Sequence, residues 1–258
     1  MSEFLSLAGK KGLVVGVANE SSIAWSCARH FHQLGAELAM TYVNDKALKW
    51  VEPLAKKVDA DPFIACDVRE PGQLEAVFAE LEQRWGKLDF LLHSIAFAPR
   101  EDLHGRLVDS SQRGFMQAMD VSCHSFIRMA RLAEPLMADD GGTLLTVSFY
   151  GAEKVVDDYN LMGPVKSALQ SSVRYMAAEL GPQGIRVHAL SPGPLKTRAA
   201  SGIARFDELM ERTRARAPQE QLADIEDVGA MAAFLVSDRA KTLTGNITYI
   251  DAGYHVVG

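Results

Sequence analysis

The sequence of 258 residues has little cysteine and no long apolar run. Its three cysteines, Cys27, Cys66 and Cys123, form no CxxC pair and no His/Cys cluster. A widely spaced, odd set argues against a disulfide framework and a metal site and indicates buried thiols in a reducing compartment. No stretch of about 18 apolar residues predicts a membrane-spanning helix, and "MSEFLSLAGKKG" lacks the pattern of a signal peptide. We therefore expect a cytoplasmic protein without membrane contact.

The chain also has no excess of positive charge, because its 27 lysines and arginines are outnumbered by 33 aspartates and glutamates. Its net charge is −6. A general nucleic-acid binder needs a basic face to replace phosphate counterions, so that class is excluded. Hydrophobic residues make up 48% and charged residues 23% of the chain, which predicts a large core rather than disorder. No linker, repeat or low-complexity segment divides the sequence, so we expect one domain over residues 1–258.

Short β-branched runs alternate with longer segments of helical period. The expected strands are "GLVVGV" (12–17), "AELAMTY" (36–42), "PFIACDV" (62–68), "LDFLLHS" (88–94), "GTLLTVSF" (142–149), "IRVHALS" (185–191) and "NITYID" (246–251). Between them, segments such as "GQLEAVFAELEQRWG" repeat apolar residues every three to four positions. This alternation predicts a doubly wound α/β domain of the Rossmann type, with a mostly parallel seven-stranded sheet and helices on both faces.

Residues 195–222, "LKTRAASGIARFDELMERTRARAPQEQL", interrupt that rhythm. They have a helical pattern but lie between strands, where a plain crossover would be shorter. Insertions at the carboxyl ends of strands are where such folds build substrate covers. We therefore expect a helical segment that covers the substrate.

The first expected strand leads into "GVANESSIA" (16–24) and then an amphipathic helix. A strand, a turn of small residues and a helix N-terminus can hold a pyrophosphate against free backbone N–H groups. The strict GxGxxG pattern is absent, so Gly16 is either part of such a turn or an ordinary strand-ending glycine.

Two further strand ends carry candidate residues. Asp67 closes the third expected strand, where it either accepts a hydrogen bond from an adenine amine or caps a helix that begins near Pro71. "HSIAFAP" (93–99) closes the fourth with small residues, where a ribose and a nicotinamide would lie. His93 alone fits a structural histidine better than a catalytic base.

Tyr159 and Lys166 are separated by two turns of an expected helix, which would place both side chains on one face about 10 Å apart along the axis. A lysine ammonium and a cofactor ribose could lower the tyrosine pKa from about 10 toward neutrality. The phenol could then donate to a substrate oxygen that becomes negative as hydride arrives. The alternative is a core tyrosine and a surface lysine at chance spacing. The nucleotide motifs upstream, in the right order, favour the functional interpretation.

These motifs together resemble one known family. "GVANESSIAW", "TYVNDK", "CDV", "HSIAFAP", "YGAEKVVDDYNLMGPVK", "SPGPLKTRAASGI" and "DAGY" occur in the order found in bacterial enoyl-acyl-carrier-protein reductases, a divergent branch of the short-chain dehydrogenases. The resemblance covers nearly the whole chain. Two features separate this branch from ketoreductases: His-Ser-Ile ends the fourth strand in place of Asn-Asn-Ala-Gly, and six residues rather than three separate the tyrosine from the lysine.

The resemblance implies an oxidoreductase of the fatty-acid elongation cycle that uses NADH to reduce the 2,3 double bond of trans-2-enoyl thioesters. Tyr159 would hydrogen-bond the thioester oxygen as it becomes an enolate, and Lys166 would bind the nicotinamide ribose. Gly16, Ser22 and Ile23 would lie at the pyrophosphate, Asp67 and Val68 at the adenine, Ser94 and Ile95 along the cofactor, Ala98 at the acyl substrate, and residues 195–199, with Leu195 and Thr197, over the nicotinamide. Family members are usually homotetramers, with the Tyr/Lys helix and the last strand at the contacts.

Two departures from the family concern the ligand sites. Phe149 stands where the family usually has a second tyrosine, ten positions before Tyr159. The adjacent Tyr150 would point to the opposite face of a strand, so the resemblance implies a drier substrate pocket with an aromatic wall. Val43 replaces a glutamine that meets the adenosine ribose, which leaves the choice between NADH and NADPH less defined. Asp45 nearby disfavours a ribose phosphate, so NADH is favoured over NADPH.

A third departure concerns the acyl carrier protein, the acidic partner that would deliver the thioester. Basic residues often follow "AASGI" in the family, but this chain has Ala204, Asp207 and Glu208. Arg205, Arg212, Arg214 and Arg216 either supply a displaced basic patch or belong to a solvated charged helix.

Pro164 precedes Lys166 by two residues and would make the helix that carries this lysine start late or kink.

Two rival functions remain open from the sequence. The same Tyr159/Lys166 pair would also serve a dehydrogenase that reduces a ketone. A protein that senses NAD(H) without turnover would keep the glycine turn but would not need the pair, so the intact pair argues against it.

Overall fold

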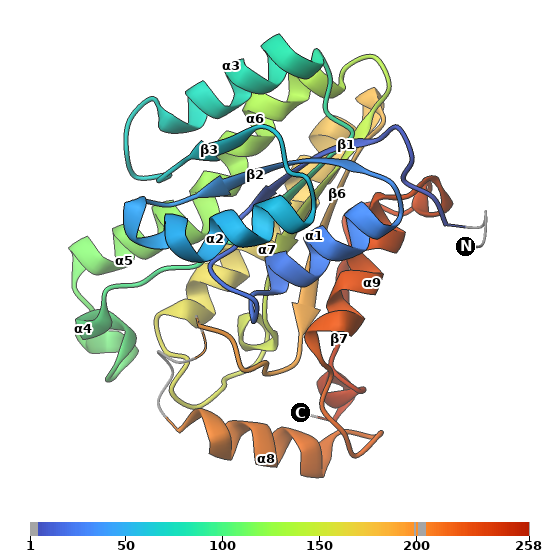
Figure 1. The fold of residues 1–258 in the computed structure, drawn as a ribbon. Helices are drawn as coiled ribbons and strands as arrows, with labels where there is room; N and C mark the ends of the chain where they lie inside the picture. The colour runs from blue at the N-terminus through green and yellow to red at the C-terminus, as the bar shows by residue number, and fades with distance from the viewer. Residues whose placement is uncertain (1–4, 199, 201–204, 258) are drawn as a thin grey trace.

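The computed structural model of the chain describes residues 5–198, 200 and 205–257 (Figure 1). Seven strands form one parallel sheet in the order β3-β2-β1-β4-β5-β6-β7, which confirms the predicted doubly wound α/β fold. The strands are β1 Lys11–Val15, β2 Glu37–Tyr42, β3 Phe63–Ala65, β4 Phe90–His93, β5 Gly142–Val147, β6 Ile185–Pro192 and β7 Ile247–Ile250. Each lies within, or within one residue of, the run that predicted it.

Helices connect these strands across both faces of the sheet. They are α1 Ile23–Gln33, α2 Asp45–Lys57, α3 Gln73–Trp85, α4 Arg100–Leu103, α5 Gln112–Met119, α6 Ser125–Met137, α7 Met162–Leu180, α8 Phe206–Arg216 and α9 Ile225–Val236. Short 3-10 turns lie at η1 Leu107–Asp109, η3 Tyr150–Ala152, η4 Gly181–Gln183, η6 Asp238–Ala240 and η7 Tyr254–Val256, and a π-helical turn, η2 Asp120–His124, joins α5 to α6.

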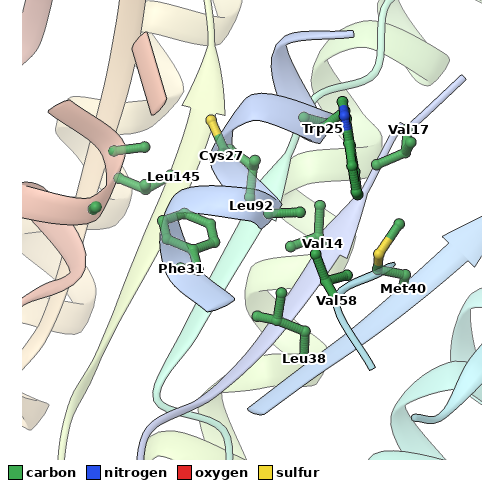
Figure 2. Packing of buried hydrophobic residues seen from close by; sticks show 14 of the residues in the cluster. Val14, Val17, Trp25, Cys27, Phe31, Leu38, Met40, Val58, Leu92 and Leu145 are labelled. Carbon is green, nitrogen blue, oxygen red and sulfur yellow. The ribbon is translucent and has the colours of Figure 1, made fainter. Parts of the chain in front are cut away.

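Alternate residues of the central strands enter two separate cores. Val14 packs with α1, α2 and α9, whereas Leu13 and Val15 pack with α3, α6 and α7 on the other face. Figure 2 shows the first core, in which Phe31 and Cys27 of α1 face the strands. A parallel sheet buried on both faces needs near-continuous apolar strands, which explains why short runs were sufficient to identify them. The three cysteines are buried and unpaired, as expected.

The strand order reverses between β1 and β4. Val15 pairs with His93, and His93 pairs in turn with Thr146 of β5, so the carboxyl ends of three neighbouring strands lie together. Ligands of open α/β sheets bind beyond such carboxyl ends, at the point where the order reverses. The fold therefore brings "GVANESSIA", "HSIAFAP" and the residues after β5 to one edge of the sheet.

Within the described residues, no helix is both long and apolar enough to cross a membrane.

Candidate functional site

Gly16 lies where the backbones after β1 and β4 approach each other. Its φ is 110°, in the left-handed region, and a Cβ added there would lie 2.1 Å from the carbonyl oxygen of Ser94. Any other residue would push the two strand ends apart, because the obstacle is backbone. Gly16 therefore has a specific role in shaping this edge.

The N-terminus of α1 presents unused backbone donors to the same edge. The Ser22 hydroxyl turns back and accepts hydrogen bonds from the N–H groups of Ala18 and Asn19, both at 3.0 Å, so it does not cap the helix that begins at Ile23. The first turn of α1 carries no acidic residue. Free N–H groups and the positive end of the helix dipole favour an anion, so this turn fits a pyrophosphate.

Asp67 lies after β3 and is nearly buried, with 9% of its surface exposed. Its carboxylate accepts hydrogen bonds from the backbone N–H of Arg69 at 3.0 Å and from that residue's guanidinium at 2.6 Å. The Arg69 guanidinium holds the pKa of Asp67 below its usual range. The alternative in which Asp67 caps a helix is wrong, because α3 begins at Gln73 and its cap is Gly72. An adenine amine that bound this carboxylate would have to share it with the Arg69 guanidinium.

The residue after Asp67 and the residue after β2 differ in how much of their surface is exposed. Val68 is buried, and its carbonyl accepts a hydrogen bond of 2.7 Å from Arg128. Val43 is 44% exposed just beyond β2 and can offer only apolar contact. Asn44 caps α2 by accepting from the Ala47 N–H at 3.0 Å.

His93 is a structural residue, in agreement with the preferred reading of the sequence. It is fully buried, with Nδ1 2.8 Å from the Thr146 hydroxyl and Nε2 2.8 Å from the Ser125 hydroxyl. Burial lowers the pKa of His93 to about 3, with a smaller contribution from Lys166. A neutral ring held at both nitrogens fixes the end of β4, from which Ser94 and Ile95 continue. The Ser94 N–H donates to the Val15 carbonyl at 2.9 Å, and Ile95 packs against the second core.

Lys166 is a buried cation on the second turn of α7, with 4% of its surface exposed. Its ammonium donates a hydrogen bond of 2.6 Å to the carbonyl of Val147, the last residue of β5. Burial lowers the pKa of Lys166 to about 8, so the side chain still carries its charge at neutral pH. This contact places one positive charge at the carboxyl end of the central strands.

Tyr159 does not lie on the helix that carries Lys166, so the prediction of a shared helical face is wrong. The tyrosine is in a turn, and α7 begins only at Met162. Asp158 and Asn160 flank it with φ values of 62° and 39°, which no α-helix accommodates. Pro164 falls in the first turn of α7, the helical position that tolerates proline, so the helix starts late as expected.

The Tyr159 ring is packed among apolar groups. Its centroid lies 4.8 Å from that of Phe149 with the planes tilted by 59°, and a Cβ on Gly151 would lie 2.4 Å from its Cδ1. Ala98 contacts the same cluster. Burial raises the pKa of Tyr159, and the lowering expected from a lysine ammonium together with a cofactor ribose stays a prediction for the cofactor complex. Burial disfavours the charged phenolate, so the phenol stays protonated.

Phe149 and Tyr150 point to different surroundings, as predicted for neighbours on an extended segment. Phe149 faces Tyr159, whereas Tyr150 packs edge-on against Tyr254 at 5.4 Å. The Tyr150 hydroxyl is buried and finds no hydrogen-bond partner among the described residues. Tyr150 therefore does not replace the hydroxyl that Phe149 lacks.

The segment expected to cover the substrate is partly described. Leu195 is buried in the first core, and the Thr197 hydroxyl accepts a hydrogen bond of 3.2 Å from the Ala200 N–H. Ala199 and Ala204 lie outside the described residues. The predicted helical character is present in α8.

Two serines that sequence reasoning missed hold the loop after β4. The Ser122 hydroxyl accepts from the Phe97 N–H at 2.9 Å and donates to the Phe97 carbonyl at 3.0 Å. Ser125 contacts His93 and donates to the Val121 carbonyl at 2.7 Å. Both come from the π-helical turn η2 and its junction with α6, an irregularity often found at functional sites. The only sequence signal was two hydroxyls on an otherwise apolar helical face.

Metal ligands do not cluster in the described ranges, where no group of three or more His, Cys, Asp or Glu side chains could hold an ion. A cavity of about 550 Å³ lies elsewhere, between α9, the end of β7 and the turn after it, and none of the predicted site residues lines it.

Comparison with known proteins agrees with this geometry. Residues 16–255 match the family described as enoyl-(acyl carrier protein) reductase. The chain is 46% identical to enoyl-acyl-carrier-protein reductase (NADH) 1 of Rhizobium meliloti, over 97% of this chain and 92% of that protein. Identity to the FabI enoyl-acyl-carrier-protein reductase (NADH) of Aquifex aeolicus is also 46%, over 98% and 93%.

Solved structures give the same result. The crystal structure of the Aquifex aeolicus reductase superposes with a TM-score of 0.93, covering 98% of this chain and 99% of that one. A reductase from Anaplasma phagocytophilum, solved in complex with NAD, is 44% identical with a TM-score of 0.93, covering 98% and 96%. The chain therefore belongs to the enoyl-acyl-carrier-protein reductase family.

Proposed function

We propose that this protein is an NADH-dependent oxidoreductase that reduces the 2,3 double bond of trans-2-enoyl thioesters in fatty-acid elongation. The observation that carries the proposal is a buried phenol at Tyr159, packed on Phe149 two residues beyond β5, together with a buried ammonium at Lys166 on the last carbonyl of β5. The printed names of the relatives from Rhizobium and Aquifex, which specify NADH, support it.

The residues present at the sheet edge fit a dinucleotide. The close approach at Gly16 and the first turn of α1, which begins at Ile23, suit a pyrophosphate, with Ser22 fixing the preceding turn. Asp67 and Val68 would lie at the adenine. Ser94, Ile95, Leu195, Thr197 and Lys166 would line the remaining cofactor. When bound, NADH supplies a hydride to the β-carbon of the enoyl group.

Tyr159 and Lys166 stabilise the charge that the reduction creates on the substrate. As the β-carbon is reduced, electron density moves to the thioester oxygen, and a protonated phenol can donate a hydrogen bond to it. The raised pKa keeps this donor in its neutral form. The Lys166 ammonium, anchored on the Val147 carbonyl, keeps the local field positive and can donate its remaining protons to ribose hydroxyls.

Phe149 and Ala98 would make the acyl side of the site apolar. Phe149 packs on Tyr159 and offers no hydroxyl, so Tyr159 alone among this aromatic pair can donate to the thioester oxygen. A low-dielectric wall strengthens that single hydrogen bond.

NADH rather than NADPH fits the end of β2. Val43 cannot pair with a phosphate, and Asp45 at the start of α2 would repel one. These two residues therefore support the unphosphorylated ribose of NADH.

Delivery by an acyl carrier protein has weaker support on this chain. Among the four arginines considered for a basic patch, Arg205 and Arg212 form ion pairs with aspartates of this chain, and Arg216 donates to the Val257 carbonyl at 2.8 Å. We keep the carrier-bound thioester as substrate, together with a homotetrameric assembly and a cytoplasmic location, on family grounds.

One assay separates the candidates. The purified protein is mixed with NADH, and the loss of absorbance is followed after a trans-2-enoyl thioester or a 3-ketoacyl thioester is added. Oxidation with the enoyl thioester alone supports the proposal, and oxidation with the ketoacyl thioester alone supports a ketoreductase. Binding of NADH without oxidation in either case would identify a sensor.

A further inference from the structure

Two ion pairs connect α8 to the turn that carries Tyr159. Arg205 lies 2.9 Å from Oδ2 of Asp158, through both Nε and Nη2. Arg212 Nη1 lies 2.8 Å from Oδ2 of Asp157. Both aspartates directly precede Tyr159 in the chain. Figure 1 shows α8, in orange, outside the two helical layers and beyond the sheet edge where the site lies.

The two arginines attach α8 at its start and within it. Arg205 is the N-cap residue, with a left-handed φ of 49°, and Arg212 lies in the helix three positions after Leu209. Leu209 and Thr213 are the residues of α8 that are buried. Residues three positions apart are neighbours on one side of a helix, so Arg212 lies beside the buried Leu209. The helix and its N-cap therefore combine a narrow apolar contact with two charged contacts.

The small apolar contact makes the ion pairs significant for the position of α8. Two buried side chains give an eleven-residue helix little hydrophobic attachment compared with α1 or α7, which bury most of one face. Exposed ion pairs are weak one at a time, but two of them at separate points restrict both sliding and rotation of the helix. The Arg212 guanidinium also lowers the pKa of Asp157.

We propose that Asp157, Asp158, Arg205 and Arg212 are positioning residues, whose two ion pairs fasten α8 to the Tyr159 turn and so couple the substrate cover to the phenol that meets the thioester. The inference rests on the proposed function for the identity of the substrate. These residues act on Tyr159 and the cover rather than on the reacting atoms.

The variants Arg205→Gln, Arg212→Gln and the double variant test this proposal, with Arg214→Gln as the control. Arg214 is exposed on the same helix and forms no ion pair within the described residues. Loss of one exposed pair should raise KM for the enoyl thioester by about 1.5- to 5-fold, and the double variant should raise it further. NADH affinity and the KM of the control should stay unchanged.

Exchanging the two charges of the Arg212–Asp157 ion pair is the most decisive experiment. Arg212→Asp alone places two carboxylates together and should raise KM and speed hydrogen exchange of the α8 amides in the free protein. Arg212→Asp combined with Asp157→Arg should restore both quantities toward wild type. Salt should raise the wild-type KM and leave the double glutamine variant less sensitive, because the screening length falls from about 10 Å at 0.1 M to about 3 Å at 1 M.

The outcomes separate the two proposals. If wild type reduces enoyl thioesters but KM and α8 exchange are unchanged in the variants, or the exchanged pair fails to restore them, the positioning role is overturned and the proposed function stands. If wild type oxidises no NADH with any enoyl thioester, the proposed function itself fails.

Discussion

Removing one hydroxyl from each of two tyrosines in the segment between β5 and α7 tests the central claim about the site. In Tyr159→Phe the ring that packs on Phe149 and over Gly151 remains, so the apolar cluster keeps its shape. The change removes only the donor assigned to the thioester oxygen. A preorganised donor to a developing oxyanion contributes about 2.7–4 kcal/mol, so kcat should fall about 10²- to 10³-fold.

Tyr150→Phe is the matched control from the same segment. In the part of the chain that the structure describes, the buried Tyr150 hydroxyl has no hydrogen-bond partner, and the ring contact with Tyr254 survives the change. Because an unsatisfied buried hydroxyl costs about 1–3 kcal/mol, the free energy of unfolding should rise by about 1 kcal/mol, while kcat stays near wild type.

Three measurements decide the comparison: steady-state oxidation of NADH with a trans-2-enoyl thioester, NADH binding by fluorescence, and urea unfolding. NADH affinity should be nearly unchanged in both variants. The reasoning is refuted if Tyr159→Phe retains full kcat, or if Tyr150→Phe loses as much activity as Tyr159→Phe.

Three further predictions concern the cofactor edge and the buried titratable groups. Gly16→Ala should lower the free energy of unfolding by about 1–3 kcal/mol or more and weaken NADH binding. Gly72→Ala, at a similar φ of 82° but with open space around its Cβ, should leave the Kd for NADH unchanged. Equal Kd values for the two variants would contradict the close-approach argument. His93 and His188 have folded pKa values of about 3 and about 4 because burial disfavours their charged forms. The unfolded chain therefore binds more protons below pH 6.5, so the free energy of unfolding should fall as pH falls, by about 1.4 kcal/mol per pH unit for each histidine, down to those folded values. Urea unfolding between pH 7 and 5 measures this slope, and His188→Gln should remove about half of it; an unchanged slope in that variant argues against burial as the cause. Lys166 should lose its charge as pH rises through about 8, so the Kd for NADH should increase between pH 7 and 9 and become insensitive to pH in Lys166→Met; a pH-dependent Kd in that variant would assign the effect to another group.

The fold was predictable from the sequence because its strands are buried on both faces. Strands such as β4, with all four residues buried, leave short continuous apolar runs that turn residues delimit. Gly16 was also recognisable as a candidate, although only the contact with the Ser94 carbonyl showed why glycine is needed there. Local pattern is sufficient where burial itself determines which residues can occur.

The details of the site depended on side-chain contacts and backbone conformations that hydrophobic periodicity does not encode. The turn at Tyr159 is formed by two non-glycine residues with left-handed φ, Asp158 and Asn160. Because no glycine marks this turn in the sequence, the assumption of helical spacing led to the wrong geometry. Asp67 was open between two roles because its partner, Arg69, joins it by a side-chain contact that no periodicity reveals. The aspartates that pair with Arg205 and Arg212 lie about fifty residues away in the chain, so the sequence left a basic patch and a solvated charged helix both open.

The interior position of β1, between β2 and β4, also affects how the chain is made. During synthesis β1 can pair with β2 as soon as both emerge from the ribosome, but its other edge pairs with β4, which is translated much later. Until then an apolar strand edge stays open to neighbouring nascent chains, the condition under which chaperones and slow, long-range pairing matter most.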